Sequence, residues 1–378
     1  MAFKKRKKTG SKRRKPSAGD WILRLISIIS AGGLLISLLS PNIPPDQYWL
    51  PAFFGLAFPI LFIINTILLI LWILRRRWVS LIHLILLVPA TPMAFRYIQV
   101  RSDQPIHYDF ATQLISYNVR SLIDNEGKSS VHGLLKMVTQ EKPDILCLQE
   151  YRDDWWQKDD NTKKILEAGL FKEYVFESYY PVKSNKKTVG IALFSKYPIY
   201  RSGALRAGKR LIAIYADLVL KKDTVRLFNM HLQSIAFQKK DYELVEGLME
   251  AGKPISSELE TDSRQLLWKV RKAFIKRSYQ ARLLQKAIEQ SPFPVIVCGD
   301  MNDTPCSYAY NKVSANLQDA FQYAGHSIGN TYLGKLPKIR IDYVFLDRRF
   351  KCLYFDILHY HLSDHYPVNC WFYLKKYQ

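Results

Sequence analysis

Polar side chains follow the ends of several apolar, strand-like runs between residues 110 and 370. Each such residue alone is most simply a turn former or an ordinary surface group. Open α/β sheets, however, place their ligand sites just beyond the ends of strands, so the recurrence predicts one shared site rich in carboxylates, amides and imidazoles. The residues in these positions are Asn118, Glu150, His231, Asp300, Asn302, Asp342, Asp364 and His365.

Seven short motifs connect these residues to a known family. In chain order they are SYNVR, LQE, VGIALFSKYPI, NMHLQS, GDMNDTP, RIDYVF and LSDHYPV. Together they resemble the endonuclease/exonuclease/phosphatase superfamily over nearly all of residues 105–378, and GDMND and SDHYPV are each specific signals. The resemblance implies a four-layer α/β sandwich. It also implies cleavage of a phosphoester by a directly attacking water, assisted by Mg²⁺ or Mn²⁺.

Three residues are expected to form the metal site. A phosphoester anion repels nucleophiles, so a divalent cation must neutralise its charge while a base activates water. Glu150 offers the hard carboxylate oxygen that suits Mg²⁺, an ion that binds few protein ligands and keeps several waters. Asp364 would add a further carboxylate. Asn118 would hold the metal or a phosphate oxygen without adding charge.

Five residues are expected to act on the water and the phosphate. Asp300 is the candidate general base, and Asn302 would fix the water or the phosphate beside it. His365 would stabilise charge on the phosphoryl oxygens, with Asp342 orienting its imidazole as carboxylates commonly do. His231 would bind phosphate or protonate the leaving oxygen.

Weaker candidates flank this set. Asp303 matches a variant common in the superfamily, but it could serve only its own turn or loop. Thr188 and Ser363 could add hydrogen bonds near the site. Three residues share one face of a predicted long helix, where packing is the simpler explanation of their spacing. These three are Tyr279, Arg282 and Gln285.

Alternating strand and helix patterns must position these groups. Helices are expected over Lys128–Gln140 and Ser263–Gln290, and residues 237–262 between them read as a mobile insertion. Closely spaced strands favour antiparallel hairpins, and the mixture predicts two packed sheets with helices outside. The expected strands are ATQLISYNV, ILCLQ, Tyr174–Ser178, Val189–Ser195, Leu211–Val219, Val225–Met230, PVIVCGD, RIDYVFL, CLYFDILHY and YPVNCWFYL.

The first hundred residues differ in composition from the rest. They carry 14 Lys and Arg against two acids, so +12 of the net charge of +22 lies there. After a basic tail come three apolar runs, Trp21–Leu39, Leu50–Leu74 and Trp78–Phe95, of 19, 25 and 18 residues. A helix rises about 1.5 Å per residue and a bilayer core is roughly 30 Å thick, so three membrane-spanning helices are expected.

The charges between these runs predict the topology. The tail and the Arg75–Arg77 loop are basic, and the loop Ser40–Trp49 has no Lys or Arg, so the tail should be cytoplasmic. Three crossings would then place the catalytic domain outside the cytoplasm. Trp21, Trp49, Trp72 and Trp78 should lie near the interfaces. The expected units are a tail (1–20), an anchor (21–98), a linker (99–109) and a catalytic domain (110–378).

Fold and catalytic set do not name the substrate, because the superfamily includes nucleases, sphingomyelinases and inositol polyphosphate phosphatases. The inositol 5-phosphatases typically carry an Arg two residues after the Asn of GD-x-N and a PAWCDR-like segment. This chain has GDMNDT and PKIRIDY instead, which argues against that branch.

Nucleic acid is the preferred substrate, because the residues after the first hundred keep a charge of +10, and the alternative is a phospholipid or sphingomyelin-type head group beside the anchor. A third hypothesis is a catalytically silent protein that binds nucleic acid or lipid. No protein partner can be inferred. The basic clusters behind the nucleic-acid hypothesis are Lys183, Lys186, Lys187, Lys209 and Arg210.

The five cysteines give no sign of a metal or disulfide framework. They show no CxxC spacing and their number is odd. Cys147 and Cys298 lie inside apolar runs, where a free cysteine behaves as a small buried hydrophobe.

Overall fold

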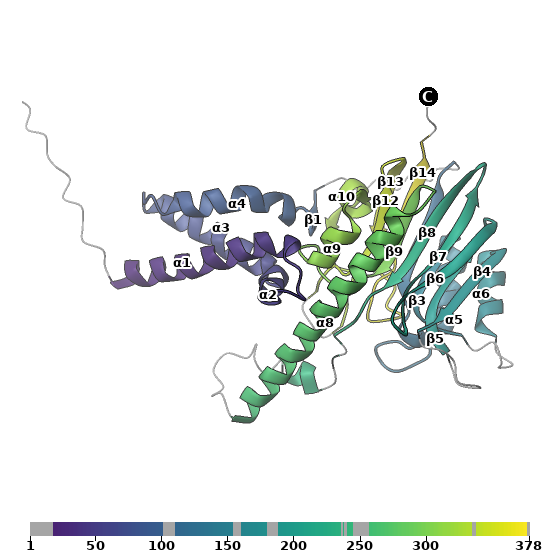
Figure 1. Cartoon of the computed structure of the whole chain (residues 1–378), viewed down its shortest axis with the longest axis horizontal. Coiled ribbons are helices and arrows are strands. Elements are labelled where there is room, and N and C mark those ends of the chain that lie inside the picture. The colour runs from purple at the N-terminus through teal and green to yellow at the C-terminus, as the bar shows by residue number, and fades with distance from the viewer. Residues whose placement is uncertain are drawn as a thin grey trace, which may run out of the picture.

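The fold is described from a computed structural model of the chain. The described residues are 18–100, 110–153, 160–179, 188–235, 237, 240–244, 257–334 and 338–375. They form a bundle of apolar helices at one end and a larger α/β sandwich at the other, in contact with each other (Figure 1).

Two six-stranded sheets form the centre of the sandwich. In spatial order, the first sheet consists of β10 (Leu317–Asp319), β12 (Asp342–Asp347), β9 (Val295–Asp300), β8 (Asp223–His231), β7 (Arg210–Leu220) and β6 (Ile199–Ala207). The second consists of β13 (Phe350–Ile357), β14 (Val368–Leu374), β2 (Thr112–Asn118), β3 (Ile145–Asp153), β5 (Thr188–Ser195) and β4 (Glu173–Ser178).

One parallel pair of strands lies in the middle of each sheet. β2 pairs in parallel with β3, and β8 pairs in parallel with β9, while the other described pairs in these sheets are antiparallel. Every residue of β2 and β9 is buried, as expected for near-continuous apolar strands covered on both faces. In the β8–β9 register His231 lies opposite Asp300, so two candidate site residues meet at the carboxyl edge of the sheet.

Helices cover both outer faces. The outer face of the second sheet packs against α5 (Val131–Glu141) and α6 (Asn161–Gly169). That of the first packs against α8 (Ser257–Glu289) and α9 (Tyr308–Val313), and α10 (Ala320–Ala324) packs on the core between the sheets. The two mixed sheets flanked by helices confirm the predicted sandwich. All five cysteines are buried, including Cys147 and Cys298, for which the sequence predicts burial.

The predicted strands are present with small shifts in their ends. Some elements that the sequence analysis did not predict are also present. β6 was not expected because its sequence, IYRSGALRA, is polar and contains Gly, yet it pairs along β7 at the edge of its sheet. The short helices α6, α9 and α10 were also missed. Within the expected insertion 237–262, residues 245–256 lie outside the described residues, 240–244 are helical and α8 begins at Ser257.

The expectation of three membrane-spanning helices is wrong. In the described part of the chain, one helix, Gly19–Asn42, is long and apolar enough to cross a membrane. The second run is bent by 68° between α2 (Leu50–Leu56) and α3 (Phe58–Leu74), so it counts at most as one broken span. The third yields only α4 (Ser80–Ala94), which contains two prolines and spans roughly 22 Å at 1.5 Å per residue.

Buried polar contacts hold the bundle helices together. The Trp72 indole N–H donates to Ser27 Oγ at 2.8 Å, so Trp72 is buried between helices. The amide of Asn65 donates to Ser30 Oγ at 2.8 Å, and its oxygen lies 2.8 Å from His83 Nδ1. By contrast, Trp21 and Trp78 are exposed.

The bundle is fixed to the sandwich by hydrogen bonds and by an ion pair. Ser40 Oγ donates to the Cys306 carbonyl at 2.9 Å, at the point where α1 (Ala18–Leu39) has ended. Asp46 accepts hydrogen bonds from Arg282 at 2.9 Å and from Ser278 at 2.7 Å, both on α8. The short strand β1 (Ile98–Gln99) pairs with β11 (Ser327–Ile328).

Candidate active site

The candidate site lies where the carboxyl ends of the central strands of the two sheets face each other. Asn118, the last residue of β2, donates from Nδ2 to Asp300 Oδ2 at 3.0 Å and to Glu150 Oε1 at 3.4 Å. Glu150 lies in β3 and Asp300 ends β9, so this one amide joins residues of both sheets. Residues separated by up to 182 positions are thereby brought into direct contact.

Asp300 is the buried centre of the site. Its Oδ1 accepts the backbone N–H of Asn302 at 2.7 Å, and its Oδ2 accepts the Asn302 side-chain amide at 2.9 Å. This tight loop requires Gly299, whose φ is +125° and where a Cβ would lie 2.0 Å from the Met230 carbonyl oxygen. Burial raises the pKa of Asp300 to about 7, which is suited to a general base near neutral pH.

His365 and Asp342 form a buried pair beside Asp300. His365 Nδ1 lies 2.9 Å from Asp342 Oδ2, and its Nε2 lies 3.8 Å from Asp300 Oδ2. Burial alone would lower the pKa of His365, but the Asp342 and Asp300 carboxylates outweigh it and raise the pKa to about 10. His365 is therefore a cation at neutral pH. The Thr331 hydroxyl accepts the Asp342 backbone N–H at 3.1 Å and anchors the pair.

His231 faces the same space from β8. Its Nε2 lies 3.6 Å from Glu150 Oε1 and 3.5 Å from Asp300 Oδ2, and it has no hydrogen-bond partner among the described residues. Its Nδ1 contacts the Tyr179 hydroxyl, which also accepts the Glu150 backbone N–H at 2.9 Å. Because Tyr179 accepts that N–H, its own proton is directed to Nδ1, and the His231 proton is left on Nε2.

The charge state of His231 supports this arrangement. Burial, with a smaller contribution from Arg210, holds the pKa of His231 well below its usual range, so the imidazole is neutral. A neutral ring with its proton on Nε2 is a hydrogen-bond donor aimed at the centre of the site. Tyr179 was missed in the sequence; the signal for it was its place directly after a strand, the same signal that identified the other residues.

Tyr179→Phe should reduce kcat by about 10-fold to 100-fold, as loss of a residue that orients a catalytic imidazole commonly does. KM should change little, because the ring and the phosphate-facing groups remain. Steady-state kinetics on a phosphodiester substrate checks this. Tyr197→Phe is the matched control, because the Tyr197 hydroxyl contacts Thr112 at 3.1 Å, away from the site, and its loss should leave kcat unchanged.

Asp364 lies at the rim, next to His365. Its Oδ1 accepts the Ser363 hydroxyl at 3.2 Å, and its Oδ2 lies 3.8 Å from Arg120 Nε. Ser363 Oγ also accepts the His365 backbone N–H at 3.3 Å, so this weaker candidate positions two site residues. The structure therefore brings all eight predicted residues to one place.

The donor set fits a divalent cation. Burial, together with the nearby Asp364 carboxylate, raises the pKa of Glu150, and a bound cation would offset this excess of negative charge. Ligand atoms of Asp300, Asp342 and His365 lie within 4.8 Å of one another. The His365–Asp342 hydrogen bond already engages two of these groups, so carboxylates that Mg²⁺ or Mn²⁺ would prefer are better sought at Glu150 and Asp364.

Asn118 is oriented as a donor in this arrangement. Its Nδ2 faces both carboxylates, while its Oδ1 accepts the Arg120 backbone N–H at 3.1 Å. An amide nitrogen does not ligate a cation, so Asn118 is better suited to hold carboxylates or a phosphate oxygen in place.

The remaining weaker candidates have structural roles. Asp303 is buried and accepts from Arg277 Nε at 2.9 Å, so it fixes the loop after Asp300 to α8. Arg282 binds Asp46 of the bundle, and Tyr279 is 51% exposed. Gln285 donates to Glu289 one turn later on the same helix. The side chain of Thr188 lies outside the described part of the chain.

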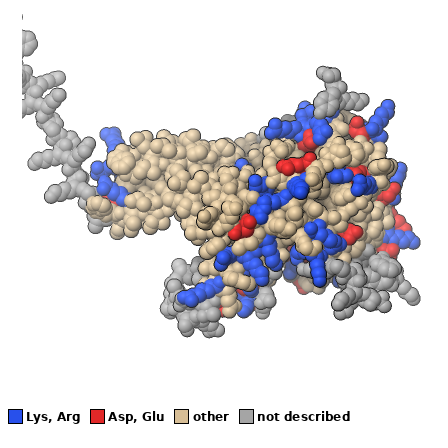
Figure 2. Space-filling model, viewed as in Figure 1, with Lys and Arg blue, Asp and Glu red and all other residues tan. Residues whose placement is uncertain are grey.

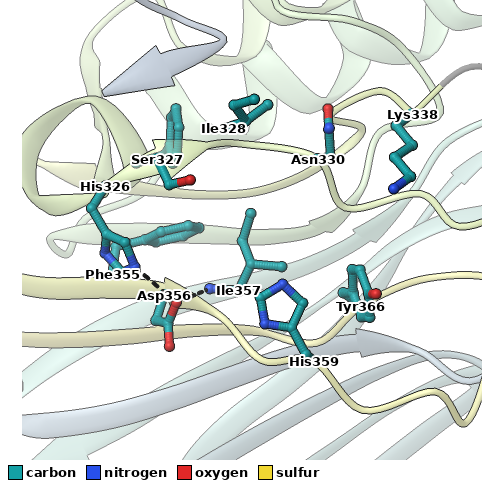
Figure 3. Close-up of a pocket in the computed structure, with 11 residues that line it drawn as sticks. His326, Ser327, Ile328, Asn330, Lys338, Phe355, Asp356, Ile357, His359 and Tyr366 are labelled. Carbon is teal, nitrogen blue, oxygen red and sulfur yellow. Dashed lines mark hydrogen bonds and ion pairs between the residues drawn. The ribbon is translucent and has the colours of Figure 1, made fainter. Parts of the chain in front are cut away.

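A separate cavity of about 300 Å³ lies behind the wall that carries His365 (Figure 3). Lys338, Asn330 and His359 point into it, and Tyr366 forms part of its wall. Tyr332 and His365 form a β-bridge, so the next residue, Tyr366, faces the opposite side from His365. None of the eight predicted site residues lines this cavity.

The family model described as the endonuclease/exonuclease/phosphatase family matches residues 115–365, a range that contains every predicted site residue. The chain belongs to this family. Enzymes of the endonuclease/exonuclease/phosphatase family are generally phosphoester hydrolases and are typically dependent on a divalent metal. A second family model, a domain of unknown function, matches residues 20–97, which form the apolar bundle.

Solved structures share the fold of the sandwich. An endonuclease/exonuclease/phosphatase family protein from Leptotrichia buccalis is 13% identical with a TM-score of 0.50, covering 70% of this chain and 100% of that one. The human Nocturnin catalytic domain with bound sulfate is 19% identical with a TM-score of 0.49, covering 71% and 97%. A Bacteroides thetaiotaomicron mannosyl-6-phosphatase is 15% identical with a TM-score of 0.47, covering 70% and 100%. No curated protein matches the chain.

Proposed function

We propose that this protein is a membrane-tethered phosphodiesterase that depends on Mg²⁺ or Mn²⁺. The observation that carries the proposal is the contact of Asp300 with Asn118, His231 and His365 at the edge shared by the two sheets. A silent binding protein would not need a buried base, a neutral imidazole and a charged imidazole around one centre.

The proposed roles follow from the protonation states. Asp300 accepts the proton of the attacking water, and Asn302 holds that water or the phosphate beside it. His365, kept charged by Asp342, stabilises the negative charge that develops on the phosphoryl oxygens. His231 donates from Nε2 to the phosphate or to the leaving oxygen.

Glu150 and Asp364 would hold the cation, with Asn118 fixing the neighbouring carboxylates. When bound, a divalent cation neutralises charge on the phosphate and lowers the pKa of water. The fit rests on four carboxylates gathered in one place, of which Asp300 and Asp342 are buried and Glu150 and Asp364 are partly exposed.

Two substrate classes follow from different observations. The basic balance supports nucleic acid, and Arg210 of the predicted clusters lies 5.6 Å from the Tyr179 ring, next to the site. The three lysines of the other cluster, Lys183, Lys186 and Lys187, lie outside the described residues. A phospholipid head group is supported by α8, because this helix contacts both the bundle, at Asp46, and the loops of the site, at Asp303.

A substrate panel tests the function. Full-length protein in lipid nanodiscs with Mg²⁺ or Mn²⁺ should hydrolyse at least one of single-stranded DNA, double-stranded DNA, RNA, sphingomyelin or a glycerophospholipid, in preference to a phosphomonoester. EDTA should remove the activity and Mn²⁺ should restore it, since the cation neutralises the phosphate. Binding without turnover under every metal would reject the enzyme in favour of a silent binding protein.

We also propose that α1 is the membrane anchor. The basic tail before it would remain in the cytoplasm, and a crossing by α1 would place residues 110–378 on the opposite side. The division into tail, anchor, linker and catalytic domain stays a prediction.

A further inference from the structure

The N-terminal half of α8 carries an exposed stripe with an unusual composition. It consists of Arg264, Leu267, Trp268, Arg271 and Lys272, which recur at the i, i+3, i+4, i+7 and i+8 positions of one helix face. Leu267 is 53% exposed and Trp268 is 57% exposed. We refer to these five residues as the α8 stripe.

The charges of α8 are divided between two faces. Residues 263–288 contain eight Lys and Arg and no acid. Three of these bases pair with acids elsewhere in the fold: Lys269 with Asp241, Arg277 with Asp303 and Arg282 with Asp46. On the stripe, Lys272 Nζ lies 4.6 Å from the Trp268 ring, so a base and an aromatic ring are presented together.

The stripe lies at the end of the proposed span. Gly19–Asn42 has 24 residues, so it rises roughly 36 Å at 1.5 Å per residue and the membrane surface would fall near its C-terminal end. The segment that follows is in contact with α8: Arg271 lies 5.2 Å from the Trp49 ring, and the Phe53 and Phe274 rings are 5.2 Å apart.

The views of the whole molecule agree with this placement. In Figure 1 the N-terminal half of α8 extends obliquely from the sandwich toward the side occupied by α2 and the bundle. In Figure 2 Lys and Arg gather along α8, next to a bundle surface with almost no charge. Tyr48 and Leu50, 70% and 53% exposed, continue the apolar and aromatic surface beside Trp49.

We propose that the α8 stripe lies in the head-group layer of an anionic bilayer. This inference rests on the proposed anchoring by α1. Trp and Leu beside Lys and Arg are the side chains that such a layer accepts, because apolar parts enter the acyl boundary while bases meet anionic lipid.

The consequence for the site is a fixed orientation toward the membrane. Arg277 of α8 donates to Asp303 at 2.9 Å and to the Gln233 carbonyl at 2.9 Å, and Gln280 accepts the Gln233 backbone N–H at 2.8 Å. Gln233 and Asp303 follow the site residues His231 and Asp300. A helix lying on the lipid would therefore hold both loops of the site at a constant height above the membrane.

Fluorescence quenching by brominated lipids tests the inference. The native cysteines are all buried, so single cysteines introduced at exposed positions of the full chain can be labelled with an environment-sensitive dye. The test position is Trp268→Cys, and two controls are Ile29→Cys on α1 and Tyr200→Cys on β6, 67% and 77% exposed. The protein is placed in nanodiscs of phosphatidylcholine with and without phosphatidylglycerol.

The label at position 268 should be quenched more by bromines near the head group than by bromines deep in the acyl chains, as expected for a depth of roughly 5–10 Å. Its quenching should increase with phosphatidylglycerol, and the label at 200 should not be quenched. If the label at position 29 is quenched but the label at position 268 is as little quenched as the one at position 200, then α1 is the anchor but the stripe does not contact lipid. That result would overturn the inference in favour of a protein partner for the stripe. If position 29 is not quenched either, the anchor fails as well.

Discussion

Asp300→Asn should lower kcat by about 10³-fold or more, because a general base contributes up to about 10⁴-fold to the rate. The same substitution should make the folded protein more stable. The substitution keeps the size of the side chain. Its amide oxygen can accept from the Asn118 and Asn302 side chains, and only the hydrogen bond from the Asn302 backbone N–H to Oδ1 is lost. That loss costs about 1 kcal/mol, which is less than the expected gain from removing the ionisation. Turnover of a phosphodiester with Mn²⁺ measures the first effect.

The stability effect follows from the pKa of Asp300. Burial raises it from 3.8 to about 7, so the folded protein holds the proton more tightly than the unfolded chain does. Stability is then unaffected below about pH 4 and falls as the pH rises through 7, since the native state binds more protons in that window. Asn cannot ionise, so at pH 8 in EDTA the variant should be more stable by roughly 1–3 kcal/mol.

Asp319→Asn is the matched control for this pair of effects. Asp319 is equally buried, but its carboxylate pairs with Arg340 at 2.6 Å, and its pKa is lowered because Arg340 outweighs burial. Its neutralisation leaves a buried guanidinium without its partner, so it should destabilise the protein by about 3 kcal/mol while activity per folded molecule is retained. A lower melting temperature for Asp300→Asn than for the parent would contradict the claim that ionisation of the buried Asp300 carboxylate destabilises the folded protein.

His365→Ala should reduce kcat by about 10³-fold, the loss typical of removing one group that stabilises transition-state charge. The reason is that His365 is the cation nearest to Asp300, at 3.8 Å, and is held in place by Asp342. Kinetics and a melting curve together separate lost chemistry from lost folding. Wild-type kcat in a folded His365→Ala protein would remove this residue from the mechanism.

Asp342→Asn tests how His365 is kept charged. The Asp342 carboxylate is the main group that raises the pKa of His365 to about 10, so its neutralisation should move the alkaline limb of kcat to lower pH. His326 and Asp356 form a comparable pair at 3.5 Å, away from the site, and His326→Ala should change neither kcat nor its pH profile. An unshifted alkaline limb in Asp342→Asn would show that another group sets it.

Local composition was not enough to predict the structure of the apolar bundle. Apolar content alone predicted three spans, but a bend of 68° at Ala57 breaks the second run, and α4 has only 15 residues. Trp72 is buried against Ser27, because a helix packed in a bundle has an inner face that a linear run of residues does not reveal.

Sequence alone was sufficient for the class of the fold and for the family, and it named the eight residues that the structure brings together, because strand periodicity and short motifs are local properties of the chain. Only the tertiary structure decided how those residues work together: Tyr179 directing the His231 proton, Asn118 acting as a donor, and Asp342 charging His365. These features depend on burial and on contacts between residues distant in the chain, and no local pattern encodes either. The same holds for the placement of α8 beside the bundle, because the contact between Arg282 and Asp46 joins residues 236 positions apart.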